Sequence, residues 1–60
     1  MKTKTVKGTL HKNTITTSIE TIPVITYKGT PDCTGWFLLQ ETQFRYDTKW
    51  VVVEYVEEEN

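Results

Sequence analysis

The last third of the chain contains two β-rich runs separated by a short polar segment. The runs cover residues 36–39 and 50–56, and Arg45 to Lys49 lie between them. Aromatic and β-branched residues favour pleated strands, so this pattern predicts a β-hairpin. Apolar residues fall on both faces of both runs, yet a two-stranded ribbon covers only one side of a core. The second apolar face must therefore be covered by the rest of a small domain or by another molecule.

Chain length and cysteine content limit how such a domain is stabilised. Sixty residues form one domain at most, 1–60, and a chain this short is marginally stable without a staple or a partner. Cys33 is the only cysteine, so no internal disulfide forms, and with His11 it falls short of the four ligands of a structural zinc. We expect no cofactor and no metal.

The same features predict a location. A lone thiol fits a reducing compartment, because small secreted domains carry many paired cysteines. The first five residues lack the apolar stretch of a signal peptide, and no segment approaches the roughly 20 apolar residues of a membrane span. We therefore expect a cytoplasmic protein without membrane contact.

Composition favours strands throughout the chain. Twelve threonines and ten valines or isoleucines stand against no alanine, and β-branched side chains pack well on a pleated surface. No stretch keeps a helical apolar period. We predict an all-β domain with five strands near 3–11, 14–21, 23–28, 36–46 and 49–57, curled into a small antiparallel barrel of SH3-like or OB-like type. A flatter sheet that is stable only as a dimer is the alternative, and we expect the acidic tail, 57–60, to be frayed.

The first hairpin is predicted to turn at Lys12 and Asn13, since Asn suits the positive φ of tight turns. With this turn, three pairs of facing residues lie on one face of the hairpin and polar residues lie on the other. The pattern therefore specifies the register in which the two strands pair. Pro23 lacks an amide donor, which places it at a strand start, an edge or a bend. The three pairs are Leu10 with Ile15, Gly8 with Thr17, and Val6 with Ile19.

The last hairpin is predicted to turn at Asp47 and Thr48. One face is then nearly free of charge and is predicted to be core; it carries Trp36, Leu38, Phe44, Val51, Val53 and Tyr55. The other face holds Phe37, Leu39, Trp50, Val52 and Val56, with Arg45 beside Trp50 and Glu41 opposite Glu54. Facing carboxylates repel each other and are costly to bury, so we expect the middle of this second face to meet solvent. A monomer core does not account for the apolar residues at its two ends.

An exposed apolar face on a soluble protein usually marks an interaction site. We therefore predict a non-catalytic protein-binding module. None of the motifs of cold-shock, SH3-like or AbrB-like domains is present. In style, a short and mildly acidic β protein resembles the accessory proteins of bacteriophages and other mobile elements, which often bind, and so inhibit, a larger host protein. The predicted partner-binding residues are Phe37, Leu39, Trp50, Val52, Val56 and Arg45.

Charge is distributed unevenly along a chain whose net charge is −1. Residues 1–30 hold five lysines and one glutamate, whereas residues 31–60 hold seven acidic residues with Arg45 and Lys49. Either the first and last strands lie side by side and neutralise each other, or the lysines form a basic face. The second case predicts a barrel that binds single-stranded nucleic acid, with stacking by Trp36 or Tyr27. Its basic residues would be Lys2, Lys4, Lys7, Lys12 and Lys28.

Catalysis and self-association are two further possible functions. His11 flanks a predicted turn without a nucleophile or orienting carboxylate near it in sequence, and a carboxylate beside Cys33 raises a thiol pKa instead of activating it. No phosphate-binding loop or metal-spaced cluster is present, so we expect no enzymatic activity. A symmetric dimer with its axis beside Val52 is a third hypothesis, because pairing would bury more apolar surface.

Overall fold

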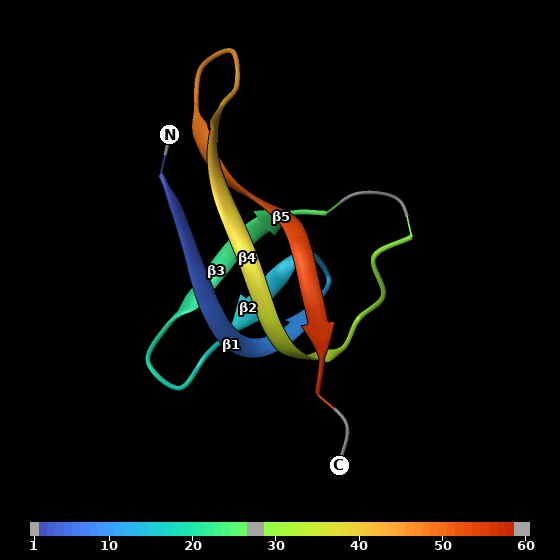
Figure 1. Ribbon diagram of the computed structural model, residues 1–60. Helices are drawn as coiled ribbons and strands as arrows, with labels where there is room; N and C mark the ends of the chain where they lie inside the picture. The colour runs from blue at the N-terminus through green and yellow to red at the C-terminus, as the bar shows by residue number, and fades with distance from the viewer. Residues whose placement is uncertain (1, 27–28, 59–60) are drawn as a thin grey trace.

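A computed structural model describes residues 2–26 and 29–58, which form five strands and no helix. The strands are β1 (Thr3–His11), β2 (Thr14–Thr16), β3 (Thr21–Ile25), β4 (Thr34–Gln43) and β5 (Thr48–Glu57). They form one mixed sheet that closes into a ring in the order β1-β2-β3-β5-β4 (Figure 1). The ring is not a regular barrel, since only two residue pairs join β3 to β5. The all-β class is confirmed, but the purely antiparallel arrangement is wrong because β3 and β5 run parallel.

The β1–β2 hairpin has the predicted turn and the predicted register near it. Leu10 pairs with Ile15, and both side chains are buried. Lys12 and Asn13 have φ values of 50° and 58°, as a two-residue turn between twisted strands requires. The alternation of apolar and polar residues therefore predicted the register of this part of the hairpin correctly.

Beyond Thr16, which pairs with Thr9 as expected, the predicted first hairpin is wrong. β2 ends at Thr16, and the hydroxyl of Thr17 accepts hydrogen bonds from the amides of Ile19 (3.3 Å) and Glu20 (3.0 Å). Threonine side chains stabilise turns in this way, so the chain reverses at residues 17–20 and β3 begins at Thr21. Ile19 consequently lies in the turn and is 85% exposed. Residues 27 and 28, in the predicted third strand, lie outside the described residues.

Strand β1 takes part in two pairings, and Gly8 lies close to the point where one pairing gives way to the other. Its first part pairs with β4, with Val6 opposite Phe37 and Gly8 opposite Gly35, whereas its last part pairs with β2. A Cβ atom at Gly8 would lie 2.5 Å from the carbonyl oxygen of Thr16. Only a residue without a side chain permits this approach, which lets β1 pass from one half of the ring to the other.

The β4–β5 hairpin turns at a different place from the one predicted. Gln43 pairs with Thr48 and Glu41 with Trp50, so the turn lies at Arg45 and Tyr46. A β-bulge follows further along the hairpin, where Leu38 and Leu39 of β4 face residues 54 and 52 of β5. One residue of β5 is left over there, and such an insertion reverses which face each later side chain occupies.

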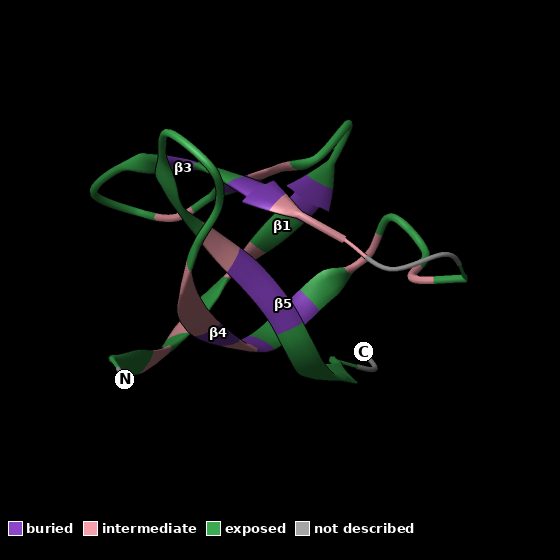
Figure 2. Cartoon of the chain, turned by 90° about the horizontal axis from the view of Figure 1, so that it is seen from above, coloured by how far each residue is buried: buried purple, intermediate pink, exposed green. Residues whose placement is uncertain are grey.

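The core lies inside the ring, where the strands face one another (Figure 2). Its residues come from all five strands, and the largest fully buried side chains are Phe37, Leu10, Ile15 and Leu39. Val6, Cys33 and Trp50 pack against this cluster while partly exposed. The faces predicted for β4 are therefore reversed: Phe37 and Leu39 are core, and Trp36 and Leu38 point outward.

Candidate functional site

The structure separates the residues predicted to bind a partner. Phe37 and Leu39 are fully buried and Val52 nearly so, so their side chains belong to the core of the monomer; the dimer with its axis beside Val52 stays a prediction. Trp50 is half-buried against the core. Val56 is 68% exposed on β5, and Arg45 is exposed at the β4–β5 turn. The six residues do not form one surface.

A different set of apolar side chains meets solvent on the outside of β4 and β5. Trp36 (49% exposed) lies opposite Val56 in the antiparallel ladder, and Val53 is also exposed. Leu38, two residues along from Trp36, is partly exposed. We call Trp36, Leu38, Val53 and Val56 the outer apolar face. The predicted surplus of apolar surface on this hairpin thus lies on the face opposite to the one expected.

A groove of about 400 Å³ borders the outer apolar face. Its wall on β5 consists of five consecutive residues, 52–56, and Thr5 of β1 and Thr30 of the β3–β4 loop complete its sides. The groove lies in the range of volumes that bind ligands and is open to solvent.

The charges beside this groove are mainly negative. Lys7 lies between two groups: its ammonium nitrogen is 3.4 Å from a carboxylate oxygen of Glu58 and 5.9 Å from the centre of the Trp36 ring. Glu54 and Glu57 are exposed on β5. The first and last strands do not lie side by side as predicted, because β4 lies between β1 and β5, but Lys7 and Glu58 still form an ion pair. Glu57 lies within β5 and the amide of Glu58 donates to the carbonyl of Thr34 (2.9 Å), so the tail is not frayed at these two residues; residues 59 and 60 lie outside the described residues.

The lysines of the predicted nucleic-acid site are spread over the molecule. Lys4 points to the inner side of the ring, where its ammonium group lies 4.4 Å from the centre of the Trp50 ring. Lys7 is on the outer side, and Lys12 is at the β1–β2 turn. Lys2 is exposed next to β1, and Lys28 lies outside the described residues. These lysines therefore form no single basic face in the described part of the chain.

One end of the ring does combine cations with aromatic rings. The backbone carbonyl of Lys2 accepts a hydrogen bond from the Glu41 amide (2.9 Å), which brings it close to the Lys4–Trp50 contact. At the neighbouring β4–β5 turn, the Arg45 guanidinium lies 5.9 Å from the centre of the Tyr46 ring. Tyr46 is 88% exposed. Cation–π contacts of this kind are worth about 0.5–1 kcal/mol at exposed sites.

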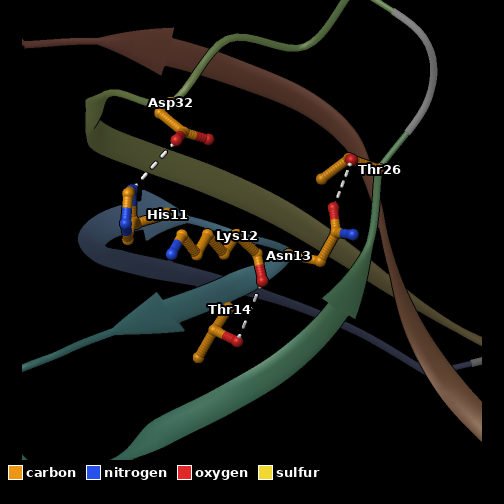
Figure 3. A network of polar contacts seen from close by, with 6 residues as sticks. All are labelled: His11, Lys12, Asn13, Thr14, Thr26 and Asp32. Atoms are coloured by element: carbon orange, nitrogen blue, oxygen red, sulfur yellow. Dashed lines mark hydrogen bonds and ion pairs between the residues drawn. The ribbon is translucent and has the colours of Figure 1, made fainter.

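His11 has a partner that the sequence did not reveal. Its Nδ1 atom lies 3.0 Å from a carboxylate oxygen of Asp32, and the hydroxyl of Thr26 donates to the side-chain oxygen of Asn13 (2.9 Å). Together these contacts attach both ends of the β3–β4 loop to the β1–β2 turn (Figure 3). All four side chains are at least partly exposed, and the contacts hold the loop in place.

Cys33 is a partly buried thiol at the end of the same loop. Burial raises its pKa, and the charges of Glu57 and Asp32 raise it further. A thiol acts as a nucleophile in its ionised form, so this environment makes Cys33 less reactive than an ordinary cysteine. The predicted effect of Asp32 on the thiol has the right direction, but burial is the larger cause.

The described residues contain no group of three or more His, Cys, Asp or Glu side chains that could hold a metal ion. No helix in the described part of the chain is long and apolar enough to cross a lipid bilayer.

Comparison with known proteins adds no relative. The chain matches no family model, no curated protein and no solved structure. A proposal for its function must therefore be based on its own surfaces.

Proposed function

We propose that the protein is a non-catalytic protein-binding module, of the accessory or inhibitor type, that holds a larger protein against its outer apolar face. The observation that supports this proposal is the exposure of Trp36 and Val56 as a cross-strand pair. A patch of neighbouring apolar side chains that is exposed to solvent usually marks an interaction site. Tryptophan is also the residue type most enriched among the side chains that dominate binding energy.

The binding experiment compares three variants of the full chain with the wild type. Immobilised protein captures its partner from the source cell, and the purified partner is then titrated calorimetrically. Trp36→Ala should raise the Kd by about 30-fold, the effect of losing an anchor worth about 2 kcal/mol. Val56→Lys should weaken binding as well, whereas Thr3→Lys, the same charge at an exposed site on β1, should leave it unchanged. Equal Kd values for wild type and Trp36→Ala would refute the proposal.

The same face could instead be covered by a second copy of the chain. Sedimentation of the purified protein over a hundredfold range of concentration, on the order of 1 to 100 μM, separates these cases. We expect a constant species of 7.0 kDa. A dimer that Val56→Lys converts to a monomer would show that the face serves self-association.

We infer that the ring is an OB-like small barrel and not an SH3-like one. OB folds are five-stranded, partly open barrels, and this ring has five strands with a weak seam between β3 and β5. Many OB folds bind oligonucleotides on the surface of their second and third strands. Here the exposed residues of those strands are threonines and Pro23, which offer neither charge nor aromatic stacking.

Single-stranded nucleic-acid binding remains the second candidate because Lys4, Trp50, Arg45 and Tyr46 place cations and rings at one end of the ring. Proteins that hold single strands combine these two features. Binding through phosphates would weaken steeply with salt. The test is fluorescence anisotropy of a labelled mixed-sequence oligonucleotide at low salt, with Lys4→Ser as the variant. No change at about 10 μM protein would eliminate this candidate.

A further inference from the structure

The edge of β5 that faces away from β4 is open along the last part of the strand. On that side only Trp50 and Val51 are paired, with Val24 and Ile25 of β3. From residue 52 to residue 57 no described residue pairs with this edge, although β4 pairs with the other edge as far as Glu57. In Figure 1 the final part of β5, in red, runs beside β4. An open edge of this kind is a template for a further strand.

The register shows which backbone groups the open edge presents. The amide of Glu58 donates to the carbonyl of Thr34, so these residues form a hydrogen-bonded pair of the β4–β5 ladder. Hydrogen-bonded and non-hydrogen-bonded pairs alternate in an antiparallel ladder. The backbone groups of Glu57 and Tyr55, one and three positions earlier, therefore point away from β4. Their N–H and C=O groups are available to an added strand.

The groove follows this same edge. Its β5 wall is made of five consecutive residues, 52–56, and consecutive side chains of a strand point to opposite faces. A groove that contacts all five therefore lies along the edge of the strand and not on one face alone. An extended peptide placed there would pair with the backbone of β5 and direct its alternate side chains toward Trp36 and Leu38.

The charges on β5 indicate which kind of strand could pair with its open edge. Glu54 and Glu57 are exposed on β5, and Glu58 follows them with Lys7 as its ion-pair partner. A second copy of the chain would bring two such acidic strands together, and like charges on neighbouring strands are destabilising. A strand with lysine or arginine among its residues would be attracted instead.

We propose that the free edge of β5 accepts an extended, basic segment of the partner protein as an additional antiparallel or parallel strand. This proposal rests on the proposed function, because it states how the partner would lie against the outer apolar face. In strand addition, main-chain hydrogen bonds supply affinity and pockets for alternate side chains supply specificity. The backbone groups of Tyr55 and Glu57 would form the main-chain hydrogen bonds. The outer apolar face would contact the alternate side chains.

The experiment uses isotope-labelled full-length protein and an acetylated heptapeptide of alternating lysine and valine as the probe. Hydrogen exchange of each amide is measured by NMR without and with the peptide. Without it, the Tyr55 and Glu57 amides should exchange fast and the Glu54 and Val56 amides slowly. With peptide at ten times its Kd, exchange at Tyr55 and Glu57 should slow by about tenfold.

Matched variants and a second probe complete the test. Glu57→Lys should weaken peptide binding, whereas Glu20→Lys, the same change at the exposed β2–β3 turn, should not. The corresponding glutamate–valine peptide should not bind. Failure of the basic peptide to bind at about 1 mM, or protection of Tyr55 and Glu57 in the free monomer, would overturn the proposal.

Repeating the measurement with the captured partner distinguishes this proposal from the proposed function. If the partner shifts the Trp36 indole signal but leaves the Tyr55 and Glu57 amides exchanging freely, strand addition is wrong, whereas binding at the outer apolar face is supported. If the partner leaves the Trp36 signal unchanged, the proposed function fails. Joint protection of both amides and a shift of the indole signal support both.

Discussion

Phe37 and Trp36 are adjacent in the sequence, yet their replacement by alanine should have very different effects on stability. Phe37 is 0% exposed and its ring centre lies 6.4 Å from that of Tyr55. Removing a buried phenylalanine costs about 3–5 kcal/mol, from lost transfer free energy and the cavity left behind. A domain of this length has a total stability of roughly 3–9 kcal/mol. Phe37→Ala should therefore leave much of the population unfolded.

Trp36→Ala should cost far less, because about half of the side chain is already exposed. Its contact with Lys7 contributes about 0.5–1 kcal/mol, and partial burial adds a comparable amount, so we expect a total of about 1–2 kcal/mol. The assay is urea unfolding followed by circular dichroism, with Phe37→Leu as a milder variant expected to cost less than about 1.5 kcal/mol. A larger loss for Trp36→Ala than for Phe37→Ala would refute the assignment of faces.

Three further predictions concern the backbone and the thiol. Lys12→Gly should stabilise the protein by about 1 kcal/mol in urea unfolding, because a non-glycine residue with positive φ is strained; a loss of stability would contradict this. Gly8→Ala should destabilise it by at least about 1 kcal/mol, since the new methyl group meets the backbone of Thr16; an unchanged urea midpoint would show that β1 bends without needing glycine. Cys33 has a raised pKa when folded, so the folded state binds the thiol proton more tightly and stability should fall as the pH rises through that pKa. Cys33→Ser should lack this alkaline loss, and an equal loss in both proteins would assign it to other groups.

The first hairpin was predictable because its apolar and polar residues alternate in only one workable register. Leu10 faces Ile15 as expected, and Asn13 occupies a turn that asparagine favours. The extent of the hairpin was not predictable in the same way. A hydrogen-bonded turn around Thr17 ends β2 early, and β1 continues with β4, a partner distant in sequence.

The buried face of the second hairpin was predicted wrongly for two physical reasons. Both of its faces are apolar, so alternation alone does not say which one is buried. Glu41 and Glu54 were expected to face each other, but the shifted turn and the bulge between them place Glu41 beside Trp50 and Glu54 beside Leu38. The two carboxylates therefore do not face each other, and their repulsion does not prevent this face from being buried. The sequence did indicate an apolar surface on this hairpin, and the structure identifies it as the outer one.

The claim that the outer apolar face binds a protein is tested most directly by site-specific photocrosslinking. A benzoylphenylalanine is placed at Val53 of the outer apolar face in one sample, so that Trp36 is kept, and at Ile19 in another; both are exposed apolar positions on different parts of the ring. Irradiation in extract of the source cell should yield one discrete adduct from position 53 and none from position 19. The absence of an adduct from position 53, or the same adduct from both positions, would contradict the claim.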